Sequence, residues 1–215
     1  MFEKSVEELT ELGAQITTAE IAQQPELWRD TLNIYRENKE AIEAFLAEAR
    51  AMGEGRLSVV FTGAGTSDYV GDTCAPYLRH AGNTDLYDFK PIATTDIVSA
   101  PRDFLRAEDP TLVVSFARSG NSPESLAAVA VAKELVHNVK FLNITCAPEG
   151  KLAVESADDP NAMTLLIPRA NDKGFAMTGS YTCMTLLSTL IFDTASDEQK
   201  ADWVETIAKM GEEVI

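Results

Sequence analysis

The residues of this chain best suited to chemistry are hydroxyl-bearing and glycine residues that follow two short apolar runs. The segment Ser115–Ser125, Ser-Phe-Ala-Arg-Ser-Gly-Asn-Ser-Pro-Glu-Ser, comes directly after Leu112-Val113-Val114 and opens a stretch of helical character. Gly120 allows close approach to the backbone, and Ser122 followed by Pro123 is a typical helix start. Because the first amides of a helix have no intrahelical partner and carry partial positive charge, this turn can hold a phosphate without a metal.

A second turn of the same kind lies upstream, at residues 62–67. The apolar run 57–61 leads there into Thr-Gly-Ala-Gly-Thr-Ser. Each turn joins an expected strand to an expected helix, and in open parallel sheets ligands bind beyond the carboxyl ends of the strands. The two turns therefore predict one shared anion site, with Arg118 as the obvious basic side chain beside it.

Composition and charge exclude several classes of partner. Lys and Arg total 18 against 34 Asp and Glu, so the formal net charge of −16 opposes a nucleic-acid partner. No apolar run approaches the roughly 20 residues that span a bilayer, and the acidic N-terminus is unlike a signal peptide. We therefore expect a cytoplasmic protein without membrane association. Cys74, Cys146 and Cys183 lack the spacing of a disulfide framework or a metal site, and we expect them to be reduced and packed.

The elements that must position these turns follow from the spacing of apolar residues. The first 55 residues have helical periodicity, and Thr17–Glu20 resembles a capping box. From Arg56 onward short β-rich runs alternate with helical segments, which indicates right-handed βαβ crossovers. Ser196–Gln199 resembles the capping box of a last helix. We expect strands near 57–61, 89–95, 111–116, 139–145 and 163–167, and helices near 67–81, 122–137 and 178–194.

This pattern predicts an α/β fold, a three-layer α-β-α sandwich. Its sheet should be mainly parallel and flavodoxin-like, with about five strands, and N-terminal helices should precede it. We divide the chain into a helical extension at 1–55, a central domain at 56–195 and a C-terminal helix at 196–215. The last helix has no convincing C-terminal cap, and we expect it to lead into a further domain.

The ordered turns resemble the SIS (sugar isomerase) domain, the phosphosugar-binding module of glucosamine-6-phosphate synthase and its relatives. Gly63-Ala64-Gly65-Thr66-Ser67 is similar to the first family loop, G-x-G-T-S, and Arg118–Ser122 corresponds to the second. Cys146–Leu152 lies where a third loop approaches the sugar. Within the family, Ser115–Ser125 most resembles the tagatose-6-phosphate ketose/aldose isomerases, which are also described as galactosamine-6-phosphate deaminases. The resemblance covers residues 50–195.

The resemblance implies roles for the matched residues. Three serines would bind the phosphate of a hexose or hexosamine 6-phosphate, and the neighbouring residues would shape the loops. The family pattern has Ser and Gln where this chain has Ala117 and Arg118, and the guanidinium can replace a lost hydroxyl by binding phosphate in a bidentate manner. No metal or organic cofactor is implied. The phosphate-binding serines would be Ser67, Ser119 and Ser122, and the full implied set is Gly65, Thr66, Ser67, Arg118, Ser119, Gly120, Asn121, Ser122 and Ala147.

The catalytic residues stay unassigned. In the resembling isomerases an acid/base Glu and a ring-opening His come from a second SIS domain or a neighbouring subunit, and neither motif matches any position between Ile144 and Ile215. We therefore expect this chain to be the binding half of an active site, in a homo-oligomer or paired with a second SIS domain.

Two other functions stay open at this point. One is a non-catalytic SIS module that senses a phosphosugar. The other is a dinucleotide-binding α/β domain, for which Asp85 lies at about the spacing of a ribose-binding acid. Against the latter, Asp68 stands where the dinucleotide fingerprint has its third glycine, and its carboxylate would repel a pyrophosphate.

Overall fold

A five-stranded sheet lies at the centre of the computed structural model, which describes residues 1–215. All strands are parallel, in the order β2-β1-β3-β4-β5. The central strands β1 and β3 are buried along their whole length, as continuous apolar runs predict for strands covered on both faces. The strands are β1 (Leu57–Gly63), β2 (Tyr87–Pro91), β3 (Thr111–Ala117), β4 (Val139–Thr145) and β5 (Ala162–Leu166).

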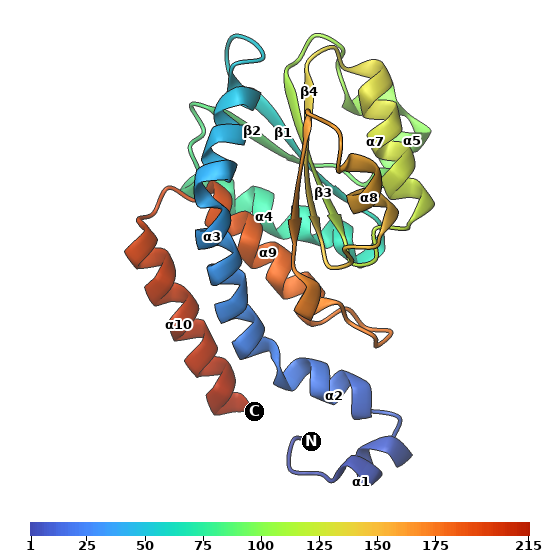
Figure 1. Ribbon diagram of the computed structural model, residues 1–215, viewed down its shortest axis with the longest axis vertical. Helices are drawn as coiled ribbons and strands as arrows, with labels where there is room; N and C mark the ends of the chain where they lie inside the picture. Colours follow the sequence, from blue (N-terminus) through green and yellow to red (C-terminus); the bar gives the residue numbers. More distant parts are fainter.

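Helices cover both faces of this sheet (Figure 1). The larger apolar core lies between the sheet and three helices, α3 (Gln24–Arg50), α4 (Asp68–Ala81) and α9 (Gly179–Phe192). A smaller core lies on the opposite face, under α5 (Thr94–Ser99) and α7 (Pro123–Leu135). The predicted three-layer sandwich with flavodoxin-like strand order is confirmed.

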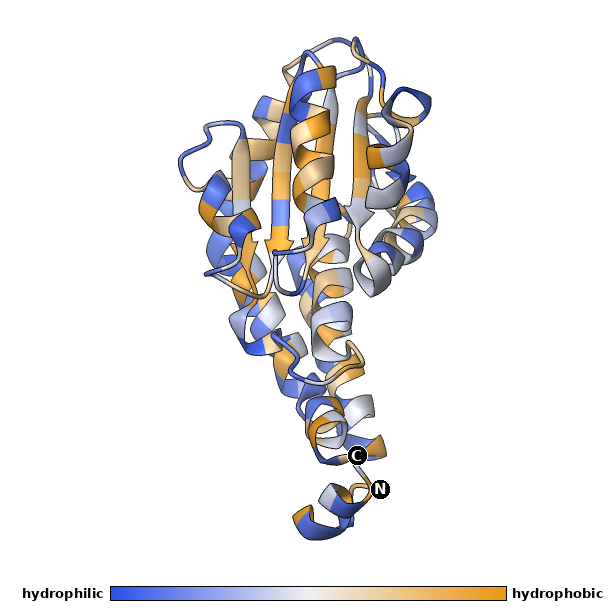
Figure 2. Cartoon of the chain, turned by 90° about the vertical axis from the view of Figure 1, so that its right-hand side faces the viewer, coloured by the Kyte–Doolittle hydropathy of each residue, from blue (hydrophilic) through white to orange (hydrophobic).

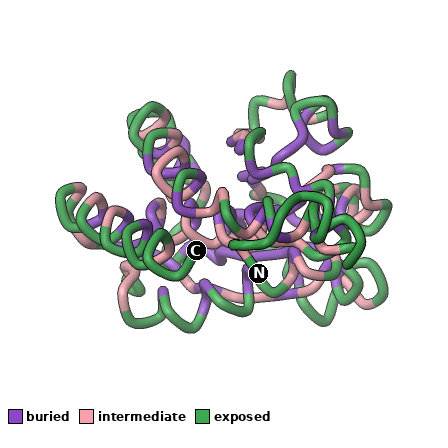
Figure 3. Tube along the Cα trace, turned by 90° about the horizontal axis from the view of Figure 1, so that it is seen from below, coloured by how far each residue is buried: buried purple, intermediate pink, exposed green.

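Aromatic packing and hydropathy mark the centre of the larger core. The Phe61 ring stacks on Phe89 at 5.9 Å between centroids and meets the edge of Phe192 at 5.6 Å, which are favourable aromatic geometries. Figure 2 shows the central strands mainly in the hydrophobic colour, with hydrophilic residues in the connecting loops. Seen from below, buried backbone gathers inside the layers and the outer turns of the helices are exposed (Figure 3).

The remaining helices lie around this sandwich. α1 (Val6–Glu11) and α2 (Gln15–Ala22) extend beyond one end of the sheet, and α10 (Asp197–Val214) lies beside α3 (Figure 1). Arg29 of α3 pairs with Glu205 of α10 at 2.9 Å and also with Glu212. The predicted capping box at Ser196 is confirmed, because Ser196 and Gln199 exchange backbone-to-side-chain hydrogen bonds. None of the helices is both long and apolar enough to cross a membrane.

Three local expectations need correction. The capping box predicted at Thr17–Glu20 is wrong, because these residues lie inside α2, whose N-cap is Ala14. The strand expected at 89–95 ends at Pro91, since α5 begins at Thr94. Three short helices, α5, α6 (Pro101–Phe104) and α8 (Lys151–Ser156), were not predicted. The expectation for the three cysteines is confirmed, because all are free and buried.

Candidate functional site

Three loops leave the carboxyl ends of neighbouring strands, where open parallel sheets bind ligands. The first loop, Ala64–Ser67, follows β1; the second loop, Arg118–Ser122, follows β3; and the third loop, Cys146–Gly150, follows β4. Because β3 lies between β1 and β4, the second loop is flanked by the other two. The two turns singled out in the sequence are therefore brought to one edge of the sheet.

Strand register places the three loops at the same level. Gly63 of β1 is aligned with Phe116 of β3, and Ala117 of β3 is aligned with Thr145 of β4. Each loop therefore begins within about one residue of its neighbours, a step of about 3.3 Å along a parallel strand. The predicted phosphate-binding turns therefore lie at nearly the same level along the sheet.

The second and third loops are joined by backbone contacts. Leu152 donates its amide to the Gly120 carbonyl at 3.0 Å, and the Lys151 amide donates to Asn121 Oδ1 at 3.1 Å. Gly120 has φ +66°, a left-handed conformation that favours glycine. A Cβ atom on Gly150 would lie 2.2 Å from the Ser119 carbonyl oxygen. Glycine at 150 therefore lets the third loop support the second.

The second loop presents unused donors at the start of α7. The amides of Ser119, Gly120 and Ser122 donate to no backbone carbonyl. Ser122 is the N-cap of α7, as predicted, yet its side chain makes no capping hydrogen bond, and Pro123 occupies the first turn. The hydroxyls of Ser119 and Ser122 and these three amides lie at the N-terminal, positive end of the 13-residue helix α7. This arrangement is suited to binding a small anion.

The first loop is less open than the second. Gly65 has φ +60° and begins the single 3-10 turn η1 (Gly65–Ser67). Just before the loop, Thr94 Oγ1 donates to the carbonyl of Gly63, the last residue of β1, at 2.9 Å. Ser67 is only 4% exposed, whereas Ser119 and Ser122 are partly exposed. Of the three predicted phosphate-binding serines, Ser67 is thus the least accessible.

Arg118 is directed toward a fourth segment, the loop between η2 (Pro168–Ala170) and α9. Its Nη1 donates to the Gly174 carbonyl at 3.1 Å, and Gly174 in turn donates its amide to Glu20 of α2 at 2.9 Å. One of the five guanidinium N–H donors is therefore used to hold this loop. The others leave Arg118 able to contact an anion at the second loop.

The start of α9 is not available to an anion. Asp172 is 5% exposed and accepts hydrogen bonds from the amides of Thr178, Gly179 and Ser180 at 2.8–3.2 Å. It also accepts from the hydroxyls of Thr178 and Ser180. A carboxylate of the chain itself thus neutralises this helix end. The starts of α4 and α7 have no side-chain cap, but α4 begins with Asp68, whereas no carboxylate caps the start of α7.

Negative charge lies close to the first loop. Asp68 follows Ser67 directly, and its pKa is raised, first by burial and then by the nearby carboxylates of Asp72 and Asp96. These groups oppose an anion on that side. The electrostatic attraction for an anion therefore comes from the second loop and Arg118.

In the third loop, the backbone rather than the buried side chains is placed to contribute to the site. Ala147 is 3% exposed and its carbonyl accepts from the Gly150 amide at 3.1 Å, so its side chain is poorly placed to touch a ligand. Cys146 is fully buried, and burial raises the pKa of its thiol to about 12. It remains protonated at neutral pH and is not a nucleophile. Pro148 and Glu149 are exposed beside these buried residues.

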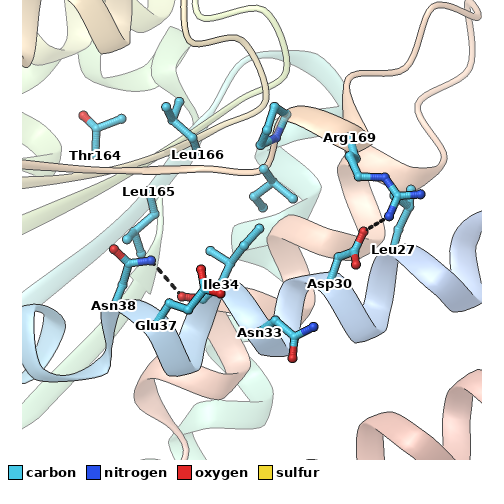
Figure 4. A pocket seen from close by; sticks show the side chains of 12 residues that line it. Leu27, Asp30, Asn33, Ile34, Glu37, Asn38, Thr164, Leu165, Leu166 and Arg169 are labelled. Atoms are coloured by element: carbon cyan, nitrogen blue, oxygen red, sulfur yellow. Dashed lines mark hydrogen bonds and ion pairs between the residues drawn. The ribbon is translucent and has the colours of Figure 1, made fainter.

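A cavity of about 570 Å³ lies elsewhere, between α3 and the edge strand β5 (Figure 4). None of the predicted site residues lines it. Its carboxylates include Glu37 and Asp30, the latter paired with Arg169. A cavity rimmed by such groups is unsuited to a phosphate, and its size alone does not make it the anion site.

Comparison with known proteins places these features in a family. The SIS domain model matches residues 55–193. A candidate D-galactosamine-6-phosphate deaminase AgaS of Streptomyces coelicolor is 45% identical over 201 residues, covering 93% of this chain and 50% of that protein. The D-galactosamine-6-phosphate deaminase AgaS of Shewanella sp. is 43% identical over 189 residues, covering 87% and 48%.

A solved structure agrees with these relatives. A candidate tagatose-6-phosphate ketose/aldose isomerase of Clostridium novyi superposes with a TM-score of 0.89 and 43% identity, over 98% of this chain and 53% of that one. The chain therefore spans about half the length of the relatives that it matches.

Proposed function

This chain belongs to the SIS domain family, and we propose that it is the phosphosugar-binding half of an aldose-ketose isomerase or deaminase. The observation that carries the proposal is the junction of β3 and α7, where the Ser119 and Ser122 hydroxyls and three free amides meet at an uncapped helix start. We favour galactosamine 6-phosphate or tagatose 6-phosphate as substrate, because the relatives at 43–45% identity carry those names. These names favour a phosphosugar over the dinucleotide alternative.

We propose that the phosphate is a handle for positioning. The second loop would fix the phosphate, so that C1 and C2 of the open-chain sugar reach an acid/base group. Binding energy from a phosphate that does not react can orient the reacting carbons and lower the barrier. The proton would move between C1 and C2 through a cis-enediol, or through an enolamine when C2 carries nitrogen, with ammonia lost in the deaminating case.

We infer that Arg118 has two tasks in this site. One N–H group ties the second loop to Gly174, and the remaining donors face the bound phosphate. Ser119 and Ser122 supply hydroxyls from either side of Gly120. Gly65, Thr66 and Ser67 would approach the sugar from the first loop, and Asn121 would shape the second loop through its contact with Lys151.

We propose that the acid/base group comes from a second SIS domain, carried by a longer polypeptide or by another subunit. Two exposed apolar features support such pairing. Phe175 projects fully exposed from the loop that Arg118 holds, and α10 exposes Trp203, Met210 and Val214 at 42%, 59% and 80%. Exposed aromatic and aliphatic side chains on fixed elements are suited to anchor a partner.

We also propose the domain division 1–55, 56–195 and 196–215, with the last helix leading toward that second domain. A cytoplasmic location follows from the proposed substrate, because a charged sugar phosphate does not cross a lipid bilayer unaided.

Calorimetry with galactosamine 6-phosphate tests the binding assignment. We expect Ser119→Ala combined with Arg118→Ala to weaken binding at least tenfold without unfolding the chain, since each lost charge-assisted hydrogen bond contributes about 1.5–3 kcal/mol. Ser99→Ala combined with Arg102→Ala is the control, because it removes the same groups on α5 and α6. Equal affinity of the two double variants would reject the assignment.

The sensor alternative is separated by turnover. A sensor binds the sugar phosphate with the same dependence on Ser119 but releases no ammonia and forms no ketose when the second domain is present. An isomerase or deaminase gains turnover only in that complete assembly.

A further inference from the structure

Five polar side chains beneath the second loop are buried, and each has an oxygen atom without a hydrogen-bond partner. We call them the polar layer. They come from three strands and from the first turn of α7, and none is more than 3% exposed. Burying a polar oxygen without a partner costs stability, so such groups normally find a partner or an ordered water. The layer consists of Thr62, Ser115, Asn143, Thr145 and Ser125.

We propose that ordered water molecules fill the polar layer and position the phosphate-binding start of α7 against the sheet. This inference assigns an internal water site to the chain. Its consequence for ligand binding rests on the function proposed above.

Strand register brings the layer together. Thr62 on β1 is aligned with Ser115 on β3, and Ser115 is aligned with Asn143 on β4. Aligned residues of parallel strands project from the same face of the sheet. Two residues earlier, the aligned Val60, Val113 and Phe141 pack in the smaller core with residues of α7. The polar row must therefore face α7 as well.

The other two members of the polar layer are Ser125, on α7, and Thr145, on β4. Ser125 lies in the first turn of α7 and is 3% exposed, which places it on the side of the helix that packs on the sheet. Thr145 lies two residues after Asn143 on β4 and so shares its face. A Cβ atom on Gly120 would lie 3.5 Å from Thr145 Oγ1. The layer thus extends to the underside of the second loop.

The spacing of the strands leaves a gap between these groups. Neighbouring strands lie about 4.8 Å apart, and Thr62 Oγ1 and Ser115 Oγ have no hydrogen-bond partner across that distance, whereas the longer Asn143 side chain does reach Thr164 on β5. One water that makes two bonds of about 2.8 Å at a near-tetrahedral angle spans about 4.6 Å. A water between Thr62 and Ser115, and another between Ser115 and Asn143, would fit this spacing.

The orientation of Asn143 supports the second of these waters. Its Nδ2 donates to Ser156 Oγ at 3.0 Å and to Thr164 Oγ1 at 3.4 Å, and Thr164 lies on β5. The other polar atom of the amide, Oδ1, has no partner, and β3 with Ser115 is the neighbouring strand on the side of β4 opposite to β5. All five groups are neutral, so the ligand that fits is water rather than an ion.

The water would support the buried Ser125 side of the first turn of α7. The apolar contacts of this helix, through Ala128 and Ala132, lie further along it. Ser115 and Ser125 are therefore positioning residues, which act on the phosphate through the helix start and do not touch it. Ser188 offers a matched control, since it is also fully buried with an unpartnered hydroxyl but lies on α9, on the opposite face.

A crystal structure of the chain that resolves ordered water tests the site directly. The proposal predicts at least two waters within hydrogen-bond distance of Thr62 Oγ1, Ser115 Oγ and Asn143 Oδ1. Hydroxyls that instead bond to backbone carbonyls in a dry interface would overturn it.

Calorimetry with galactosamine 6-phosphate and with inorganic phosphate tests the positioning role. We expect Ser115→Ala with Ser125→Ala to raise Kd about three- to tenfold, in line with one lost neutral hydrogen bond, and Ser188→Ala to leave Kd unchanged. Thr62→Val, which keeps the side-chain shape, is the alternative if the double variant does not fold. Unchanged Kd in a folded polar-layer variant would refute the positioning role. If the unmodified chain binds neither probe, the proposed function fails and the crystallographic test of the water still stands.

Discussion

Replacing Gly150 by alanine should displace the second loop through steric overlap alone. The added Cβ would lie 2.2 Å from the Ser119 carbonyl oxygen, where ordinary contacts begin at 3.4 Å. The obstacle is backbone and cannot rotate away, so the two loops must separate by about 1 Å. Gly150 itself has φ −66° and ψ 143°, which any residue adopts, so the substitution adds no backbone strain.

The displacement has separable effects on stability and on binding. Overpacking of this kind costs about 1–3 kcal/mol, and each kcal/mol lowers Tm by about 2–4 °C in a chain of this length. A shift of about 1 Å at Ser119 removes a charge-assisted hydrogen bond to the phosphate, which corresponds to a Kd about 10- to 100-fold higher.

Gly53→Ala is the matched control for this experiment. Its Cβ would lie 2.3 Å from Pro110 Cγ, a similar overlap at the opposite end of the sheet. Thermal unfolding should show both variants destabilised, and calorimetry with galactosamine 6-phosphate should show weaker binding only for Gly150→Ala. If both variants keep the Kd of the unmodified chain, the second loop does not hold the phosphate.

Three further substitutions or treatments test other parts of the structure. Asp172→Asn should lower the free energy of unfolding by about 2–3 kcal/mol in urea titrations, because the buried carboxylate caps α9, and an unchanged value would contradict that role. Asp68→Asn should bind galactosamine 6-phosphate more tightly at pH 8, because it removes a negative charge beside the first loop. Since the pKa of Asp68 is raised, the affinity ratio between the variant and the unmodified chain should approach one as pH falls and the native carboxyl is protonated; a constant ratio would argue against the charge effect. Alkylation at pH 8 should leave Cys74, Cys146 and Cys183 unmodified until urea unfolds the chain, because burial raises the pKa of their thiols to about 12, 12 and 11, and rapid native reaction would show that they are accessible.

The parts of the fold that were predicted correctly have strong local signals. β1 and β3 are continuous apolar runs buried on both faces, and the turns after them contain the Gly, Ser and Pro residues that such turns need. The short helices α5 and α8 were missed because six residues make fewer than two turns and cannot show a clear period. The false capping box at Thr17–Glu20 has the correct local pattern. However, Glu20 is buried in α2 and accepts the amides of Lys173 and Gly174, a contact that local sequence does not reveal.

In the candidate site, too, some features follow from local residue types and others depend on contacts between distant segments. Residue types predicted the Ser119 and Ser122 hydroxyls and the open start of α7. The contact from Arg118 to Gly174 joins residues 56 positions apart, so no local pattern predicts it. Gly150 carried no signal in the sequence, because its importance comes from a close approach to a different loop. The polar layer depends on strand register, which strand prediction alone does not determine.

Nuclear magnetic resonance of the isotope-labelled chain during titration with galactosamine 6-phosphate tests the central claim most directly. The account predicts that the amides of Ser119, Gly120 and Ser122 shift most, that the first loop shifts less, and that galactosamine without phosphate leaves all of them unchanged. Shifts confined to the cavity between α3 and β5, or equal responses to the sugar with and without phosphate, would contradict it.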